Sequence, residues 1–317
     1  MAQFTWNFDA PTGTYKNHAM SSRLYEAAVE NSVFMDHVTP VQGYGRKKGE
    51  TVTLTRVRNI TEPVSAVLDE QMRIPEDEFD LSTRSITVQE LGRAIPFTSL
   101  SMDLSMFDLE NPIQRKLREQ MRLVLDTMAA VAYRSALIKY VPTGTSGSPT
   151  NNIATTGTAG AQASRNVQFF DIEEIRDYMF DTLQVPPLEG GDYLAIFRTL
   201  GLRGIKRDAD WEEWHKYTDP QVKFNGEVGR LEGIRFVETN HANALRKIGA
   251  SSVLGEGVIF GDESVGLAEA MTPELRAAIP GDFGRSRAVA WYGILAFATI
   301  WDTANAGEAK IVHVSST

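Results

Sequence analysis

The longest regular pattern of apolar positions lies between Asn111 and Tyr140. Apolar residues recur there every three or four positions, which is the spacing of one face of an α-helix. That face comprises Ile113, Leu117, Met121, Val124, Met128, Val131 and Ile138, and charged residues, among them Asp126, occupy the opposite face. Asn111 is a favourable N-cap and Pro112 suits the first helical position. We therefore predict a helix of roughly 43 Å over residues 112–140. It is either a core helix of a large domain or a spine that carries a separate lobe at each end.

A period of two predicts β-strands at Thr51–Ile60 and Thr83–Leu91. The segment between them, Thr61–Ser82, is charged and contains two prolines. Two strands with so little apolar surface are marginally stable alone and usually lie on a partner. We interpret these strands as a long two-stranded arm that projects from the body. An ordinary hairpin at a sheet edge is the alternative.

The other predicted elements do not follow the regular strand–helix alternation of a parallel sheet. We expect a helix from Ser21 or Ser22 to His37, and an acidic amphipathic helix at Phe169–Leu183. The predicted strands are Asp192–Arg198, Ile234–Glu238, Gly257–Gly261 and Lys310–Val314. This mixture predicts the α+β class. The longest apolar run, Ala288–Ile300, has 13 residues and is shorter than the ~20 that a membrane-spanning helix needs.

The composition is that of a folded protein without cysteine chemistry. The chain has 317 residues, of which 42% are hydrophobic, so a sizeable core is expected rather than disorder. The absence of cysteine excludes disulfides, thiolate metal sites and cysteine nucleophiles. A net charge of −9 and a pI near 5.2 argue against a dedicated nucleic-acid-binding protein. No signal peptide is visible at the start, and we expect a soluble, intracellular protein with no membrane partner.

Four aromatic residues occur within the first fifteen positions. They are Phe4, Trp6, Phe8 and Tyr15, in an otherwise polar segment without periodicity. This density of aromatic side chains favours an arm that docks on another surface over a frayed terminus.

No constellation of residues indicates catalysis. The glycine-rich turn Gly43–Gly49 matches neither phosphate-binding loop pattern, and it precedes a strand rather than a helix. Asp208, Glu212 and His215 would share one face of a helix and hold a divalent cation there, but a solvated acidic face is the better interpretation. We therefore predict that the protein is not an enzyme and has no catalytic residue, cofactor or metal site.

Several short motifs occur in an order that resembles one known family. The motifs are G-Y-G-R-K-K-G-E (43–50), T-V-T-L-T-R-V-R (51–58), N-P-x-x-x-K-L (111–117), G-R-L-E-G-I-R-F-V-E-T-N (229–240), P-G-D-F-G-R (280–285) and W-Y-G-I-L-A-F (291–297). Their order resembles that of major capsid proteins of tailed double-stranded-DNA phages. The resemblance is closest to the branch named after coliphage N-four, which has the HK97-like capsid fold.

The resemblance implies a domain organisation for the whole chain. Residues 1–41 would form an N-terminal arm with a helix, and residues 42–98 the extended loop that lies over an adjacent subunit. Residues 99–191 would form the peripheral domain with its spine helix at 112–140. Residues 192–272 would form the axial domain, and 273–317 would return as C-terminal strands. No scaffold-like or protease-target segment precedes residue 1, so we expect no large cleaved prodomain within this chain.

The implied function is structural. The protein would self-assemble into the pentamers and hexamers of an icosahedral head, formed in the host cytoplasm and retained in the virion. Its implied partners are further copies of itself, a scaffolding protein, a portal, in some cases a decoration protein, and packaged DNA contacted non-specifically. An encapsulin-like compartment with protein cargo and a soluble enzyme or binding protein outside any shell are the alternatives.

Two charged segments are candidates for contacts between subunits. Arg46, Lys47 and Lys48 place three cations beside flexible glycines in an acidic protein, and we expect them to meet an acidic surface of an adjacent subunit. At the tip of the predicted arm, Glu70, Arg73, Glu76 and Asp77 are expected to set the register of the contact more than its affinity.

Overall fold

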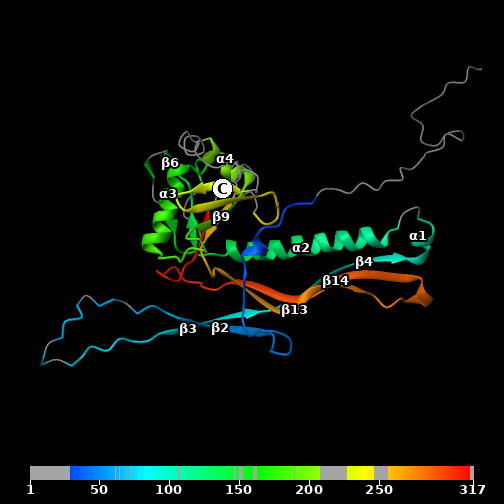
Figure 1. The fold of residues 1–317 in the computed structure, drawn as a ribbon, viewed down its shortest axis with the longest axis horizontal. Coiled ribbons are helices and arrows are strands. Elements are labelled where there is room, and N and C mark those ends of the chain that lie inside the picture. Colours follow the sequence, from blue (N-terminus) through cyan, green and yellow to red (C-terminus); the bar gives the residue numbers. More distant parts are fainter. Residues whose placement is uncertain are drawn as a thin grey trace, which may run out of the picture.

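The computed structural model describes residues 29–60, 62–63, 65–68, 70–71, 73–105, 108–145, 148–149, 153–159, 163–188, 190–207, 227–245 and 256–314. The larger β-sheet lies at the C-terminal end of one long helix, α2 (Glu110–Arg134), and the smaller sheet runs alongside that helix (Figure 1). A two-stranded arm projects from this body. Helices and strands are mixed without a repeating unit, as the α+β prediction requires. None of the described helices combines the length and the apolar character needed to cross a bilayer.

The larger sheet has seven strands. In spatial order they are β10 (Glu227–Leu231), β11 (Ile234–Thr239), β9 (Tyr193–Arg198), β12 (Gly257–Phe260), β15 (Ile311–Val314), β5 (Ile138–Tyr140) and β8 (Ile153–Ala154). β9 pairs in parallel with β11 and antiparallel with β12. The predicted strands at 192–198, 234–238, 257–261 and 310–314 are confirmed to within one residue at each end.

Both faces of the seven-stranded sheet are buried. On one face, Ala195 and Phe197 of β9 pack with Ile172 of α3 (Phe169–Asp177) and Leu202 of α4 (Thr199–Lys206). On the other face, Leu194 and Ile196 pack with the C-terminal part of α2 and with η1 (Phe34–His37). The π-helical turn η2 (Tyr178–Thr182) extends α3, so the helix predicted at 169–183 is confirmed. A sheet covered on two sides explains why its central strands are continuous apolar runs.

The smaller sheet has four strands. Their order is β1 (Thr39–Pro40), β13 (Val265–Ala277), β14 (Ser286–Thr299) and β4 (Gln89–Thr98), and η4 (Asp282–Gly284) lies between β13 and β14. Val289 and Trp291 of β14 pack against Leu117 in the N-terminal half of α2. The short helix α1 (Ser99–Asp103) follows β4. The long β13–β14 pair was not predicted, because the apolar run 288–300 shows no clean alternation in its sequence.

The predicted spine helix is present, but its ends and its buried face differ from the prediction. It begins at Glu110, whose N–H donates to Asp108 Oδ1 at 3.1 Å, and it ends at Arg134 rather than at residue 140. Residues 138–140 form β5 instead, because Ile138 is buried between β15 and β8 in the larger sheet. Val131 is 53% exposed, since the helix changes the face it buries where it passes from one sheet to the other.

Two further predictions need correction. Among residues 29–37, only Phe34–His37 is helical, as a single 3₁₀ turn, because the chain there is held by side chains of α2 and of the loop after β11. The strand predicted at 83–91 is two strands, β3 (Leu81–Thr87) in the arm and β4 in the four-stranded sheet. Residues 1–28, with the four aromatic positions, and the Asp208–His215 cluster lie outside the described residues.

Candidate functional site

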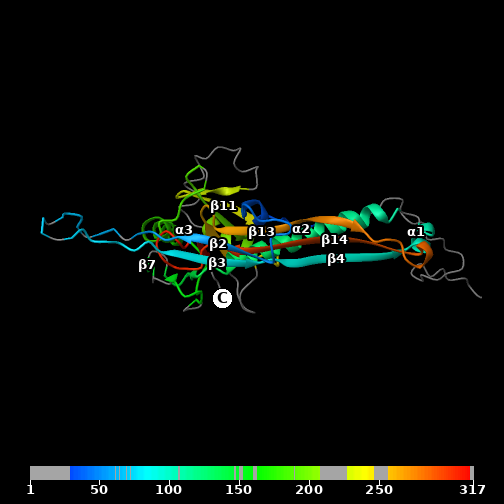
Figure 2. The same cartoon turned by 90° about the horizontal axis from the view of Figure 1, so that it is seen from below.

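The arm consists of β2 (Thr51–Val57), β3 (Leu81–Thr87) and the residues between them. The two strands pair antiparallel from Thr51–Thr87 to Val57–Leu81. Figure 2 shows the arm extending past one end of the molecule, while α1 marks the opposite end. The inner face of the hairpin carries Val52, Leu54 and Ile86, which pack against Ala268 of β13 and Ala296 of β14. The root of the arm therefore belongs to the body.

The outer face of the hairpin is exposed and carries hydroxyl groups. Thr51 and Thr87 lie opposite each other with their hydroxyl oxygens 3.0 Å apart. The next outward-facing pairs are Thr53 with Ser85 and Thr55 with Thr83. All six positions are exposed. The hydroxyl-lined face is therefore accessible to another surface.

Beyond the hydroxyl face, the arm exposes large apolar side chains. Val57 and Leu81 face each other across the last strand pair and are 55% and 53% exposed, and Val67 is 88% exposed. The full set is Val57, Ile60, Val67, Leu68, Ile74, Phe79 and Leu81. Removing such side chains from water contributes about 25 cal/mol per Å² of apolar surface. A set of this size on a projecting element is typical of an interaction surface rather than of an isolated monomer.

An ion-pair cluster holds the arm at its root. Arg56 of β2 and Arg84 of β3 both bind the carboxylate of Asp302, in the segment that leads from β14 to β15, and Arg56 Nη1 lies 2.6 Å from Asp302 Oδ1. Arg56 also donates to the Ile300 carbonyl at 3.1 Å and lies over the Trp301 ring at 5.0 Å. We call Arg56, Arg84 and Asp302 the arm latch. Partial burial would raise the pKa of Asp302, but the two arginines hold that pKa below its ordinary value.

A second bridge lies one step farther along the arm. Arg58 Nη1 lies 2.9 Å from Asp80 Oδ2, and Arg58 Nε lies 3.4 Å from Glu308 Oε1. Glu308 is buried and accepts a hydrogen bond from Asn305 at 3.0 Å. The segment after β14 thus carries two carboxylates, those of Asp302 and Glu308, that bind arginines of the arm. These contacts fix the direction in which the arm leaves the body.

The structure places the predicted contact residues at opposite ends of the arm. The basic turn, Arg46–Lys48, precedes β2 and is exposed. Lys48 Nζ donates to the Gly43 carbonyl, and the Tyr44 hydroxyl donates to the Gly49 carbonyl at 2.8 Å. Gly43 and Gly49 have positive φ angles of 77° and 93°, which glycine adopts without steric cost. These bonds and glycines shape the turn, and its three cationic residues remain exposed.

At the tip, Arg73 forms an ion pair with Glu76 within the same chain. Glu70 and Asp77 are exposed. The structure therefore brings Arg73 and Glu76 together, and it keeps the tip away from the basic turn.

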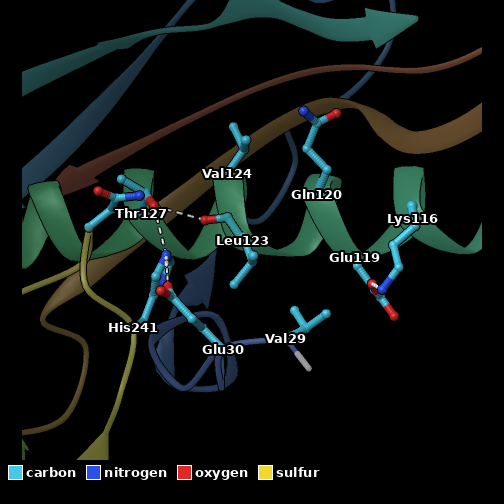
Figure 3. Close-up of a pocket in the computed structure, with 10 residues that line it drawn as sticks. Val29, Glu30, Lys116, Glu119, Gln120, Leu123, Val124, Thr127 and His241 are labelled. Atoms are coloured by element: carbon cyan, nitrogen blue, oxygen red, sulfur yellow. Dashed lines mark hydrogen bonds and ion pairs between the residues drawn. The ribbon is translucent and has the colours of Figure 1, made fainter. Parts of the chain in front are cut away.

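A buried polar joint, which the sequence did not indicate, connects three segments near one end of a surface groove. Asp126 was predicted to lie on the charged face of the helix, but it is fully buried. Its Oδ1 accepts a hydrogen bond from the Phe34 N–H at 2.8 Å, and its Oδ2 lies 2.8 Å from His241 Nδ1. Figure 3 shows His241 beside Thr127 and Glu30 at the edge of the groove. The groove measures about 470 Å³ and is lined by residues 116–127 of α2, by residues 29–30 and by the loop after β11. The joint ties the N-terminal segment to the helix and to the larger sheet.

A second buried polar cluster lies where α2 meets β5 and β15. Arg134 Nε lies 2.8 Å from Glu256 Oε2, and Lys139 Nζ lies 2.8 Å from His313 Nδ1. Burial, together with the charge of Arg134, lowers the pKa of Lys139 to about 8, although Glu256 opposes this shift. Burial also lowers the pKa of His313. The four side chains pair with one another, and Lys139 Nζ also donates to the Arg134 carbonyl at 2.6 Å. The cluster therefore ties the end of α2 to β5 and β15. No group of three or more potential metal ligands occurs among the described residues.

No protein-family model matches this sequence, and no curated protein matches it either. Solved structures do match over nearly the whole chain. The capsid asymmetric unit of cyanophage Pam1 aligns with a TM-score of 0.71 and 15% identity, covering 100% of this chain and 99% of that one. The head structure of Helicobacter pylori bacteriophage KHP40 also aligns with a TM-score of 0.71, at 11% identity and with 98% of each chain covered. A structure from Mycobacterium phage Che8 aligns with a TM-score of 0.64 and 15% identity, covering 95% of this chain and 97% of that one.

This chain has the HK97-like capsid fold. The predicted fold class is therefore confirmed over nearly the full length of the chain. The place of this protein in the branch named after coliphage N-four stays a prediction.

Proposed function

We propose that this protein is a structural major capsid protein, whose copies assemble into the pentamers and hexamers of an icosahedral phage head that encloses double-stranded DNA. The observation that carries the proposal is the arm, an element of the capsid fold that exposes seven large apolar side chains and a hydroxyl-lined face. A neighbouring copy that covered this surface would remove it from water. Because each copy has one such arm, every copy in a closed ring would both give and receive the same contact.

The two sheets suggest how the domains of such a subunit divide. We assign the four-stranded sheet and the N-terminal half of α2 to the peripheral domain, and the seven-stranded sheet to the axial domain. Because α3 packs in the core of the seven-stranded sheet, it joins the axial domain in this scheme, although the resemblance assigned 99–191 to the peripheral domain. Residues 1–41 keep their proposed role as N-terminal arm. Residues 42–88 keep the role of extended loop, whereas β4 at 89–98 pairs with β14 and so joins the peripheral domain in this scheme.

The proposed partners follow from the same role. A scaffolding protein would guide assembly in the host cytoplasm, a portal would occupy one vertex, and a decoration protein would bind the finished shell in some systems. The protein would then remain in the virion. Its net charge of −9 implies that contact with packaged DNA is non-specific and modest.

Electron microscopy of the purified protein, expressed alone and together with neighbouring genes from its source, tests the proposal. We expect closed shells or five- and six-membered rings. Replacement of Val67, Leu68 and Phe79 by serine should reduce the yield of shells at least about tenfold, because the arm loses apolar surface to bury. The same replacement at Phe180, which is 62% exposed on η2 away from the arm, serves as the matched control.

The outcomes separate the candidate functions. A monomer under all conditions would contradict self-assembly. Shells that enclose an enzyme instead of nucleic acid would favour the encapsulin-like alternative. Normal shells from the arm variant would mean that the arm surface does not hold copies together.

A further inference from the structure

We propose that the acidic tip of the arm, Glu76–Glu78, binds the basic turn, Arg46–Lys48, of the next copy, so that arms connect head to tail. The inference rests on the proposed self-assembly and names the surfaces that meet. In this contact, the tip of one copy and the turn of the next copy are two different surfaces that bind each other.

The two surfaces are complementary in charge. Seven acidic residues and one arginine lie between Glu62 and Asp80, whereas the basic turn has three consecutive cations in a chain of net charge −9. Residues 46–48 and 76–78 are all exposed. No ion pair joins the basic turn to a carboxylate within the part of the chain that the structure describes, and Arg73 balances only one carboxylate at the tip. Each surface therefore has charge left for a partner of opposite sign.

The geometry prevents the two surfaces from meeting within one copy. The basic turn precedes the first residue of β2, and the tip follows its last residue, at the far end of the arm (Figure 1). The paired strands between them span about 20 Å at about 3.4 Å per residue. The arm latch and the inner apolar contacts hold the root of the hairpin against the body. Only a second copy can bring a basic turn to an acidic tip.

A contact of this kind gives an assembly a direction. The two patches differ, so the contact is head to tail, and such contacts close into rings when the rotation between copies permits. Exposed ion pairs are individually weak and are screened within about 10 Å at ordinary salt. We therefore assign the apolar surface of the arm to affinity, and the tip and turn to the choice of register and neighbour.

Charge-swapped chains test the contact. The turn-swapped chain carries Arg46→Glu, Lys47→Asp and Lys48→Glu. The tip-swapped chain carries Arg73→Glu, Glu76→Arg, Asp77→Lys and Glu78→Lys, which preserves the ion pair between positions 73 and 76 in reversed sense. Each chain alone should lose at least about tenfold in yield of shells or rings, because like charges then face each other. Both swaps in one chain should restore most of that yield.

A mixture of the two swapped chains gives the sharpest result. The turn-swapped chain has an acidic tip and an acidic turn, and the tip-swapped chain has a basic tip and a basic turn. Opposite charges therefore meet only when the tip of one kind of chain binds the turn of the other kind. Neighbours must then alternate, which is possible in a six-membered ring but leaves one mismatched contact in a five-membered ring. We expect native mass spectrometry of an equal mixture to show even-membered rings in which the two chains are present in equal number.

Controls separate this contact from folding and from self-assembly itself. Circular dichroism should show each swapped chain to be folded. If the wild-type protein forms shells and each swapped chain forms them equally well, the proposed contact is wrong. The proposed function would still stand. The contact is also wrong if each swapped chain is folded but forms few shells, and the chain with both swaps does not regain the yield of shells. Wild-type protein that never forms an oligomer would overturn both proposals.

Discussion

The arm and the seven-stranded sheet use the same extended backbone for opposite purposes. In the sheet, strand β9 buries side chains on both faces, and five of its six residues are buried. In the arm, strands β2 and β3 bury one face at the root and leave the other exposed, with apolar side chains at the far end. The sheet is complete within one chain, whereas the arm has surface left to bury. Burial thus separates the apolar residues that stabilise the folded chain from those that remain available for contact with another copy.

The largest expected difference between the two regions is in the stability of the monomer. Phe197 is fully buried in β9, with its ring centroid 6.0 Å from that of Phe236. Phe197→Ala should lower the free energy of unfolding by about 3–5 kcal/mol, because it removes a buried ring and leaves a cavity. Phe79→Ala on the arm is the matched change and should alter the free energy of unfolding by less than about 0.5 kcal/mol. Urea unfolding of the unassembled protein measures both, and equal losses would show that the arm is part of the monomer core.

A smaller effect is expected where the arm joins the body. Asp302→Asn keeps the shape of the side chain but removes the charge that holds Arg56 and Arg84, so the direction of the arm should become less defined. The chain has no cysteine, so single cysteines at positions 67 and 180 can carry spin labels whose separation reports that direction. The distance distribution should broaden, while unfolding free energy falls by no more than about 1 kcal/mol, since Asp302 is half exposed.

Asp80→Asn provides the control for the latch. Asp80 pairs with Arg58 farther along the arm and does not touch Asp302 or its two arginines. Its replacement should leave the distance distribution close to that of the wild type. An unchanged distribution in Asp302→Asn would show that the apolar contacts of the inner face hold the arm without the latch.

A further prediction concerns pH and the buried cluster at the end of α2. Lys139 loses its proton at about pH 8 in the folded chain and at about 10.4 when unfolded. Between these values the unfolded chain binds more protons, so this lysine makes unfolding free energy rise with pH. The stability of wild type relative to Lys139→Met should therefore increase from pH 7.5 to pH 9.5. Parallel pH profiles in urea unfolding would show that Lys139 has no lowered pKa.

Local patterns were sufficient to predict much of the fold. The alternation in 51–57, the apolar runs of the strands at 193–198 and 257–260, and the heptad-like spacing of α2 all lie within single elements. Such patterns report the type of element and that it is buried, whichever partner covers it, although α2 changes its buried face along its length. The sequence also marked the two charged ends of the arm, because clusters of like charge are visible without knowledge of the fold.

Tertiary structure decided the rest, because it depends on residues far apart in the chain. The spine helix stops at Arg134 since Ile138 is buried as a strand beside Val312. Asp126 is buried because Phe34 and His241 supply its partners from 92 and 115 residues away. The latch joins Arg56 to Asp302 across 246 residues. Local patterns in the sequence indicated α2, α3, β2, four strands of the larger sheet and the charged surfaces of the arm. The packing of distant segments set where those elements end, which polar groups are buried and in which direction the arm points.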